Sequence, residues 1–390
     1  NGGCFGAIVS NRFLTTKSGG ATRKFLLENT SLDEVCDLGD TKLFDAAVLP
    51  ALIFATKKNV KNKIPVFSSI YQHKSQNKLL INDIFSALLD DNISDFETSD
   101  GIQYHIERGT LNTINVSGTK PWAISNKVTD SWLKAVSENT KFAFGDIAKI
   151  RVGIKSCADK VFLRKDWEKI ENGNIELLFP LLTRKDLLRY SLNKEKTYSR
   201  SVLYPYDIKR ASRTPVDLDK FPYAKQYLLS HKEALSSRTY VEEAGRKWYE
   251  LWVPHSPISW KNEKIVFPDI SEKPVFCLDT SGAIVSGECY WLTLNENVHP
   301  DYLHLILGVA NSRFIEKFYD ANFSNKLYSG KRRYITQYVS KFPLPDIEAS
   351  TSRLIVQAVK EILTCIDAHR QTELEHKINH FVEKAFNVSS

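Results

Sequence analysis

The chain has 390 residues, of which 42% are hydrophobic and 25% charged, as is typical of a globular protein of about two domains. Its formal net charge of +7 is compatible with a nucleic-acid partner but does not establish one. No apolar run approaches the roughly 20 residues that span a bilayer, so we expect no membrane partner.

The first part of the chain, up to about residue 63, predicts a piece of an α/β domain. Three apolar runs, Cys4–Val9, Val35–Gly39 and Ala51–Ala55, predict strands, and Arg23–Glu28 predicts a helix. A strand so close to Asn1 has no partner before it. We therefore expect this segment to be the back half of a domain whose front half precedes Asn1.

Residues 64–114 are predicted to be a linker region with some structure. The polar, basic stretch Lys57–Lys63 leads into it as a solvated loop, and Leu79–Leu89 has helical spacing. The rest of the segment mixes short apolar stretches with Ser, Asp and Asn, which favours loops.

Residues 115–346 predict an α+β domain, because short apolar runs alternate there with Gly, Pro and Asn turns. Within it, Tyr302–Tyr319 has the spacing of one amphipathic helix. The pattern from Ser352 to Phe386 is helical again, so residues 347–390 are predicted to form a C-terminal helical segment. The strand predictions include Val161–Leu163, Ile265–Phe267, Val275–Leu278 and Tyr290–Leu292.

Several possible sites are weak. His376 and His380 are four residues apart on a predicted helix, but no third ligand is near, so we expect no metal. No glycine-rich phosphate loop is present. The six cysteines lack metal-ligand spacing and predict reduced thiols in a cytoplasmic protein. They are Cys4, Cys36, Cys157, Cys277, Cys289 and Cys365.

Two segments combine basic and aromatic residues. In Asn322–Lys341, lysines and arginines alternate with tyrosines around Gly330, a composition suited to phosphates and base stacking. A solvated basic turn explains it equally well. In Arg246–Trp252 we favour a structural role, because aromatic side chains at strand positions usually fill cores.

The first 58 residues resemble the part of γ-class DNA adenine-N6 methyltransferases that follows their catalytic motif. The similarity is to TaqI-like methyltransferases and type IIG restriction–modification enzymes. It rests on Gly2-Gly3, Asn11-Arg12-Phe13-Leu14, Thr22-Arg23-Lys24-Phe25-Leu26-Leu27, Asp37-Leu38-Gly39 and Leu43-Phe44.

The resemblance continues, in the same order, through the TaqI-like specificity domain. Each motif is weak alone, and the ordered set is more specific. The matching segments are Ile147–Lys155, Leu181–Leu187 (without the family's glycine), Lys264–Pro268, Tyr302–Arg313, Lys331–Pro345 and Leu374–Asn379. The implied fold class is an α/β remnant of a Rossmann-like methyltransferase sheet, followed by an α+β target-recognition domain and C-terminal helices.

The family's cofactor motif and its Asn-Pro-Pro-Tyr catalytic motif do not occur in this sequence. We expect both to lie upstream, so no catalytic residue is assigned to this chain. The intact parent is expected to use S-adenosylmethionine, whereas the chain alone is expected to bind no cofactor and to be inactive. The resemblance implies a base-stacking aromatic on the last strand of the first part, for which Phe54 is the candidate and Thr56 competes.

The sequence therefore predicts the C-terminal part of a DNA adenine-N6 methyltransferase from a restriction–modification system, with double-stranded DNA and the upstream catalytic half of the same polypeptide as partners. The DNA-contact candidates are Lys155, Arg184, Lys185, Lys326, Lys331, Arg332 and Arg333. One alternative is a DNA-specificity or interaction module whose catalysis comes from a partner. A small-molecule enzyme is a further alternative, but no convergent cluster of His, Asp or Cys supports it.

Overall fold

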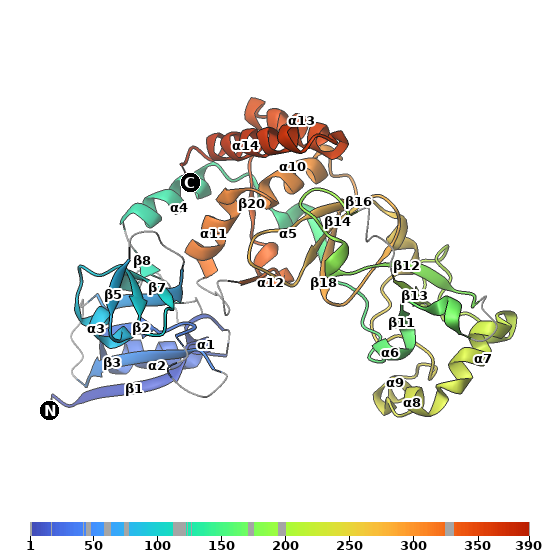
Figure 1. Cartoon of the computed structure of the whole chain (residues 1–390), viewed down its shortest axis with the longest axis horizontal. Coiled ribbons are helices and arrows are strands. Elements are labelled where there is room, and N and C mark those ends of the chain that lie inside the picture. Colours follow the sequence, from blue (N-terminus) through green and yellow to red (C-terminus); the bar gives the residue numbers. More distant parts are fainter. Residues whose placement is uncertain are drawn as a thin grey trace. The chain divides into compact units, whose positions relative to one another are not determined.

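The chain forms two compact units, shown in a computed structural model (Figure 1). The first contains Asn1–Glu138 and Glu316–Arg333, and the second contains Asn139–Ile315 and Tyr334–Ser390. The structure describes residues 2–16, 18–41, 43, 48–57, 64–73, 78–111, 122, 124–125, 127–170, 175–193, 200–323 and 331–389.

The first unit is built on one mixed sheet. Among the described residues its strands follow the order β1-β3-β2-β4-β7-β6-β5, and β8 pairs with β7. Strand β3 is antiparallel to both of its neighbours, so β1 and β2 run in the same direction, and β4 is parallel to β2. The strands are β1 (Cys4–Ser10), β2 (Ser31–Asp37), β3 (Pro50–Thr56), β4 (Val66–Gln72), β5 (Leu79–Ile81), β6 (Asp95–Thr98), β7 (Gln103–Leu111) and β8 (Ile124–Ser125).

Both faces of this sheet bury apolar side chains. Leu14 and Leu26, from α1 (Arg12–Thr15) and α2 (Gly20–Asn29), pack with Val35 and Ile53 in one cluster. A second cluster includes Ile84 and Ala87 of α3 (Ile84–Leu89). Because successive side chains of a strand point to opposite faces, β2 places Val35 in the first cluster and Cys36 in the second.

The structure confirms the strands and the helix expected before residue 58. Residues 64–111, for which the sequence predicted a linker region with some structure, contribute β4 to β7 to the same sheet. The helix expected over Leu79–Leu89 is shorter than predicted. Leu79–Ile81 pairs with β6 as strand β5, and Asp83 caps the helix by accepting a hydrogen bond from the Ser86 N–H at 2.9 Å.

The second unit contains two four-stranded sheets among its described residues, with orders β10-β18-β14-β16 and β11-β13-β12-β17. Its strands are β9 (Phe142–Ala143), β10 (Ala148–Val152), β11 (Leu163–Arg164), β12 (Leu178–Leu182), β13 (Ser201–Leu203), β14 (Lys264–Pro268), β15 (Ile270–Ser271), β16 (Cys277–Asp279), β17 (Ile284–Val285), β18 (Cys289–Leu294) and β20 (Pro343–Leu344), whereas β19 (Arg332–Arg333) belongs to the first unit.

The remaining helices lie mostly in the second unit. They are α5 (Phe144–Ile147), α6 (Asp159–Phe162), α7 (Pro222–Ser230), α8 (Lys232–Ser236), α9 (Thr239–Glu243), α10 (Asp301–Ala310), α12 (Thr336–Val339), α13 (Ser350–Thr364) and α14 (Ala368–Ala385). Helix α4 (Lys127–Glu138) belongs to the first unit, and α11 (Arg313–Phe323) contributes Glu316–Phe323 to it.

The single helix expected over Tyr302–Tyr319 is two helices, α10 and α11. Asn311 ends α10 because its side chain bonds to another segment: Oδ1 accepts from the Phe276 N–H at 2.9 Å, and Nδ2 donates to the Phe276 carbonyl at 2.8 Å. Helix α10 packs closely on α13. A Cβ at Gly308 would lie 2.6 Å from Ile355 Cγ2, so a larger residue there would require the side chains of α13 to shift.

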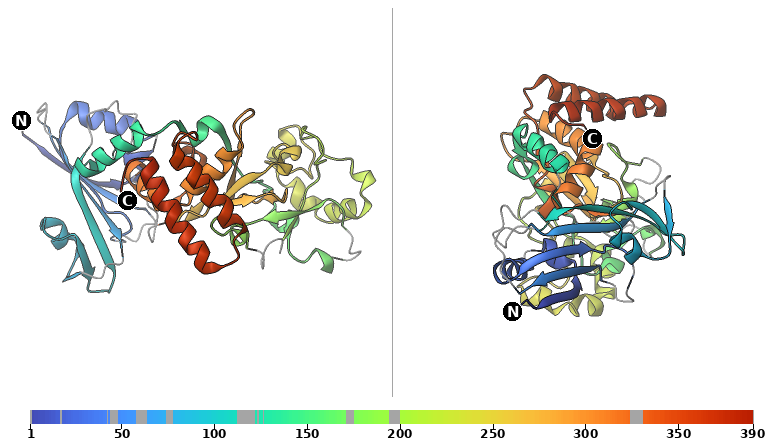
Figure 2. Two further views of the ribbon diagram at one scale, coloured as in Figure 1. Left: turned by 90° about the horizontal axis from the view of Figure 1, so that it is seen from above. Right: turned by 90° about the vertical axis from the view of Figure 1, so that its left-hand side faces the viewer.

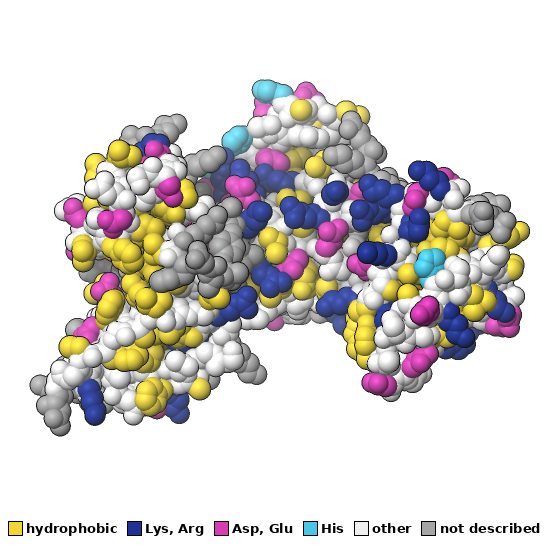
Figure 3. Space-filling view, turned by 60° about the horizontal axis from the view of Figure 1, so that its bottom comes forward, with side chains coloured by type: hydrophobic (Ala, Val, Ile, Leu, Met, Phe, Trp, Pro, Cys, Tyr) yellow, Lys and Arg dark blue, Asp and Glu magenta, His cyan; other side chains and the backbone are white. Residues whose placement is uncertain are grey.

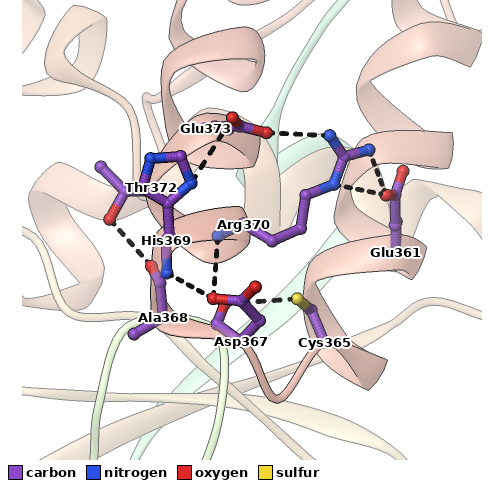
Figure 4. A network of polar contacts seen from close by, with 8 residues as sticks. All are labelled: Glu361, Cys365, Asp367, Ala368, His369, Arg370, Thr372 and Glu373. Atoms are coloured by element: carbon purple, nitrogen blue, oxygen red, sulfur yellow. Dashed lines mark hydrogen bonds and ion pairs between the residues drawn. The ribbon is translucent and has the colours of Figure 1, made fainter.

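Helices α13 and α14 lie side by side as a hairpin (Figure 2). The sequence pattern was continuous, but residues 365–367 interrupt it, and Ile366 is 93% exposed rather than buried on a helix face. Figure 4 shows the contacts at this turn: Asp367 caps α14 through the His369 N–H at 2.8 Å, and the Arg370 side chain bonds both Glu361 and Glu373.

Within the described part of the chain, every helix is too short or too polar to cross a membrane.

Candidate nucleic-acid interface

Three of the DNA-contact candidates, Lys155, Arg184 and Lys185, lie in the second unit beside the turn Ser286–Glu288. We call these three residues the basic cluster. The segment around Ile154 bridges to Ser286, and a Cβ on Gly287 would lie 3.6 Å from the Lys155 Cγ. On the other side of the turn, the Arg184 N–H donates to Glu288 Oε1 at 3.2 Å. The turn therefore brings together residues about 30 positions apart.

All three side chains of the basic cluster are exposed, and none forms an ion pair with an acidic side chain of the described residues. Exposed, unpaired cations are suited to neutralising phosphates, because they lose little hydration until a counter-ion arrives. Figure 3 shows dark-blue Lys and Arg side chains on the face that it presents.

A short helical turn orients Arg184 and Lys185 toward solvent. The Thr183 N–H and hydroxyl each donate to Asp186 Oδ2 at 2.7 Å, and Asp186 is 1% exposed. This reciprocal cap fixes the backbone of Arg184 and Lys185, whose side chains then point to solvent. The spacing Thr-x-x-Asp was the sequence signal for it, but Asp186 was not singled out there.

Two glycines allow the backbones at the basic cluster to come into contact. A Cβ at Gly153 would clash with the carbonyl oxygens of Ser286 and Val285, and one at Gly287 would lie 2.5 Å from the carbonyl oxygen of Ile154. These are backbone atoms that cannot rotate away. The cluster therefore depends on glycine at both positions, a requirement that the sequence analysis did not identify.

Arg332 is in a different environment, in the first unit. Its Nε and Nη2 each bond to Asp320 at 2.8 Å, Glu316 lies 3.7 Å from Nη1, and the side chain is 11% exposed. Its charge is thus already balanced by α11. Lys331 is exposed and Arg333 half-buried, with the Arg333 N–H donating to the Tyr319 hydroxyl at 3.2 Å. Lys326 lies outside the described residues.

Phe54, the base-stacking candidate, lies in the middle of β3 and is 44% exposed. Its ring covers Gly6 on the neighbouring strand, at 3.6 Å from an ideal Cβ. The competing position, Thr56, donates its hydroxyl to Asp33 at 2.7 Å. Phe54 therefore has the exposure that stacking requires, and its role stays a prediction.

The basic and aromatic segment Arg246–Trp252 has the structural role that we favoured. The Arg246 Nη1 donates to the carbonyl oxygens of Leu251 at 3.1 Å and Trp252 at 2.6 Å, and its guanidinium lies over the Trp252 ring. Tyr249 is 5% exposed. These contacts hold the segment to itself.

A cavity of about 210 Å³ in the first unit lies near the carboxyl ends of β1, β2 and β4. Its charged lining comprises four carboxylates and one ammonium: Asp37, Asp40, Glu107, Asp320 and Lys317. Such a lining repels phosphate, so the cavity is not part of the candidate interface. Burial raises the pKa of Asp37 to about 6, although hydrogen bonds from Asn11 and Gly39 oppose that rise.

No group of three or more His, Cys, Asp or Glu side chains among the described residues could hold a metal ion. His376 and His380 therefore have no third ligand in this part of the chain. The sequence offered Asp37 only as part of the motif Asp37-Leu38-Gly39 and gave no sign of its raised pKa, because only the folded sheet buries its carboxyl.

Comparison with known proteins identifies the class. The family model described as the TaqI-like C-terminal specificity domain matches residues 179–344. The solved structure of the type IIL restriction–modification enzyme MmeI in complex with DNA has a similar fold, with a TM-score of 0.59 at 13% identity over 99% of this chain and 47% of that chain.

Sequence relatives define the family. The type II methyltransferase M.BanIII of Aneurinibacillus aneurinilyticus is 34% identical over 399 residues, covering 99% of this chain and 68% of the relative. The type II methyltransferase M.BstVI of Geobacillus stearothermophilus is 25% identical, covering 90% of this chain and 59% of the relative. The chain belongs to the type II methyltransferase family, and it spans about two thirds of the length of these relatives. The resemblance stated from the sequence is confirmed.

Proposed function

We propose that this chain is the C-terminal part of an S-adenosylmethionine-dependent DNA adenine-N6 methyltransferase of a restriction–modification system, and that its main task is sequence-specific DNA recognition. The observation that carries the proposal is the exposed, unpaired basic cluster, of which Arg184 and Lys185 lie within the segment that matches the TaqI-like specificity domain. Its DNA substrate implies a cytoplasmic protein.

The first unit supports the catalytic part of the proposal. Strands β1 and β2 are parallel, with α2 between them in sequence, as in a Rossmann-like sheet. The cofactor motif and Asn-Pro-Pro-Tyr are absent from the 390 residues, so we assign S-adenosylmethionine binding and methyl transfer to the parent enzyme.

The mechanism of recognition follows from the chemistry of the target. The amino group of adenine is inaccessible inside a duplex, so a methyltransferase must flip the base out and hold the flanking DNA in register. Phosphate contacts from Lys155, Arg184 and Lys185 would position the duplex, since flexible exposed cations fix register without reading sequence.

The test is DNA binding by the chain as a function of salt concentration. Replacing Lys155, Arg184 and Lys185 together by Gln should reduce the slope of log K against log salt by about 2 to 3, because each lost phosphate contact removes about 0.9. The matched control replaces Lys24, Lys134 and Lys225, which are exposed and paired with Glu28, Glu138 and Asp219. Equal slopes for the two triple variants would refute the proposal.

The second candidate is a DNA-specificity module that serves a separate catalytic subunit, and the absence of both catalytic motifs favours it as an alternative. The two candidates differ in methyl transfer by the parent polypeptide. Incorporation of labelled methyl groups into DNA by that polypeptide alone would exclude the second candidate. Turnover by the 390-residue chain would contradict our expectation that it is inactive alone.

A further inference from the structure

Arg151, on the edge strand β10, holds a guanidinium whose hydrogen-bonding capacity is only partly used. Its Nη1 donates to Thr293 Oγ1 at 3.2 Å and, more weakly, to the Lys149 carbonyl oxygen at 3.4 Å. Among the described residues, Nε and Nη2 have no hydrogen-bond partner, and no acidic side chain forms an ion pair with this arginine. The edge of the guanidinium that carries the Nε and Nη2 N–H groups is therefore available to donate hydrogen bonds to an acceptor from outside the chain.

The orientation of this fork is set by a rigid aromatic support. The Arg151 Cζ lies 4.7 Å from the centroid of the Trp291 ring. Trp291 is fully buried, donates its indole N–H to the Val152 carbonyl at 3.2 Å, and packs against Trp260 in a tilted arrangement with 4.8 Å between the ring centroids. A guanidinium held over such a ring loses little further freedom when it binds a ligand.

The electrostatic surroundings are positive. Burial lowers the pKa of Arg151, but a guanidinium stays charged at neutral pH. His255, whose ring lies 5.6 Å from Trp291, also has a pKa lowered by burial, with Arg151 and Arg213 as further causes. Partly buried charges are normally paired, because desolvation is unfavourable. Because the Arg151 guanidinium is partly buried and forms no ion pair within the described part of the chain, we infer that it pairs with a ligand from outside the chain.

We propose that Arg151 is a specificity-determining residue that reads a guanine in the DNA target, donating from Nε and Nη2 to the O6 and N7 acceptors of that base. The inference rests on the proposed function and adds to it a role distinct from that of the basic cluster. A fixed planar fork matches the paired acceptors of guanine in the major groove. The exposed side chains of Lys155 and Arg184 lack such an aromatic support among the described residues, so we assign them to phosphate contacts.

The experiment selects bound duplexes from a pool with randomised sequence, using the 390-residue chain. The wild type should enrich a motif that contains at least one strongly preferred G·C pair. Arg151→Lys keeps the charge but loses the planar fork, so it should lose the preference at one G·C position by about 5- to 100-fold, while other positions and the salt slope stay unchanged. Arg151→Gln is the second variant and should lose the same position.

The matched control is Arg164→Lys, because the fork of Arg164 is occupied by Asp166 through Nε at 3.1 Å and Nη2 at 3.2 Å. It should enrich the wild-type motif. The inference is overturned if both Arg151 variants keep the full motif. It is also overturned if the motif is unchanged and the salt slope of Arg151→Gln falls by about 1, which identifies a phosphate contact. A wild-type chain that enriches no motif refutes the proposed function itself.

Discussion

Two regions that are both basic in sequence have different environments in the structure. The Arg332 side chain in the first unit is paired with two carboxylates of α11, whereas the Arg184 side chain in the second unit is exposed and forms no ion pair among the described residues. The difference teaches that the density of Lys and Arg along a chain does not identify a phosphate-binding surface. What identifies it is whether the basic side chains form ion pairs with acidic side chains once the chain has folded.

The largest effect is expected from Gly153→Ala, which would separate the two backbones at the basic cluster. A Cβ there meets backbone oxygens that cannot move independently, so we expect the free energy of unfolding to fall by about 3 kcal/mol and DNA affinity to fall with it. Urea titration and a binding assay measure the two effects. Gly3→Ala is the control, since nothing lies within 4 Å of that position. Wild-type stability of Gly153→Ala would contradict the packing described.

The next largest effect concerns the first unit and is the pH dependence that Asp37 gives to the free energy of unfolding. Burial raises the pKa of Asp37 to about 6 from 3.8, so the folded state binds the proton more tightly than the unfolded state. Below about pH 4 the carboxyl is protonated in both states and does not lower the free energy of unfolding. As the pH rises from about 4 to 6, its ionisation lowers the free energy of unfolding, by about 3 kcal/mol once ionisation is complete.

Asp37→Asn should remove this pH dependence. The difference in unfolding free energy between the variant and the wild type should grow in favour of Asn from about pH 4 to pH 6 and then stay level. Urea titrations at several pH values measure it, with Asp91→Asn as control, since the Asp91 side chain is 95% exposed. A difference that does not change with pH would show that Asp37 titrates normally.

Arg332→Gln is expected to destabilise the first unit by about 2 kcal/mol, because it leaves Asp320 and Glu316 without their largely buried cation. The effect on the salt dependence of DNA binding should be small. Lys331→Gln, next in sequence and exposed, should change stability by less than about 0.5 kcal/mol. If Arg332→Gln left stability unchanged but lowered the salt slope, Arg332 would be a DNA contact after all.

The smallest effect on stability is expected for Arg184→Gln, within about 0.5 kcal/mol, because no folded-state partner is lost. The salt slope of DNA binding should nevertheless fall by about 0.9. Comparison of Arg184→Gln with Arg332→Gln by thermal melting and salt titration tests the contrast directly. The contrast would be contradicted if both variants lowered stability, or if both lowered the salt slope of DNA binding.

The sequence by itself determined the family and much of the local structure. The strands around Cys4–Val9 and Ala51–Ala55 were predictable because each is an apolar run bounded by turn residues or charges, and this signal is local. The TaqI-like domain was predicted from the resemblance of an ordered set of motifs to a known family, not from local periodicity. Where local periodicity was continuous but a distant contact intervened, as at Asn311 with Phe276, the predicted helix was wrong.

Only the tertiary structure decided which charged residues are available. Lys155 and Arg184 lie on either side of the turn Ser286–Glu288, about 100 residues away in sequence, and Arg332 is neutralised by two carboxylates one turn apart on another helix. The partners of a charge are set by which distant segments pack together, and the same packing excludes the water that would otherwise screen it. For this reason the sequence identified a DNA-recognition domain, and the fold separated its candidate DNA contacts from its internal ion pairs.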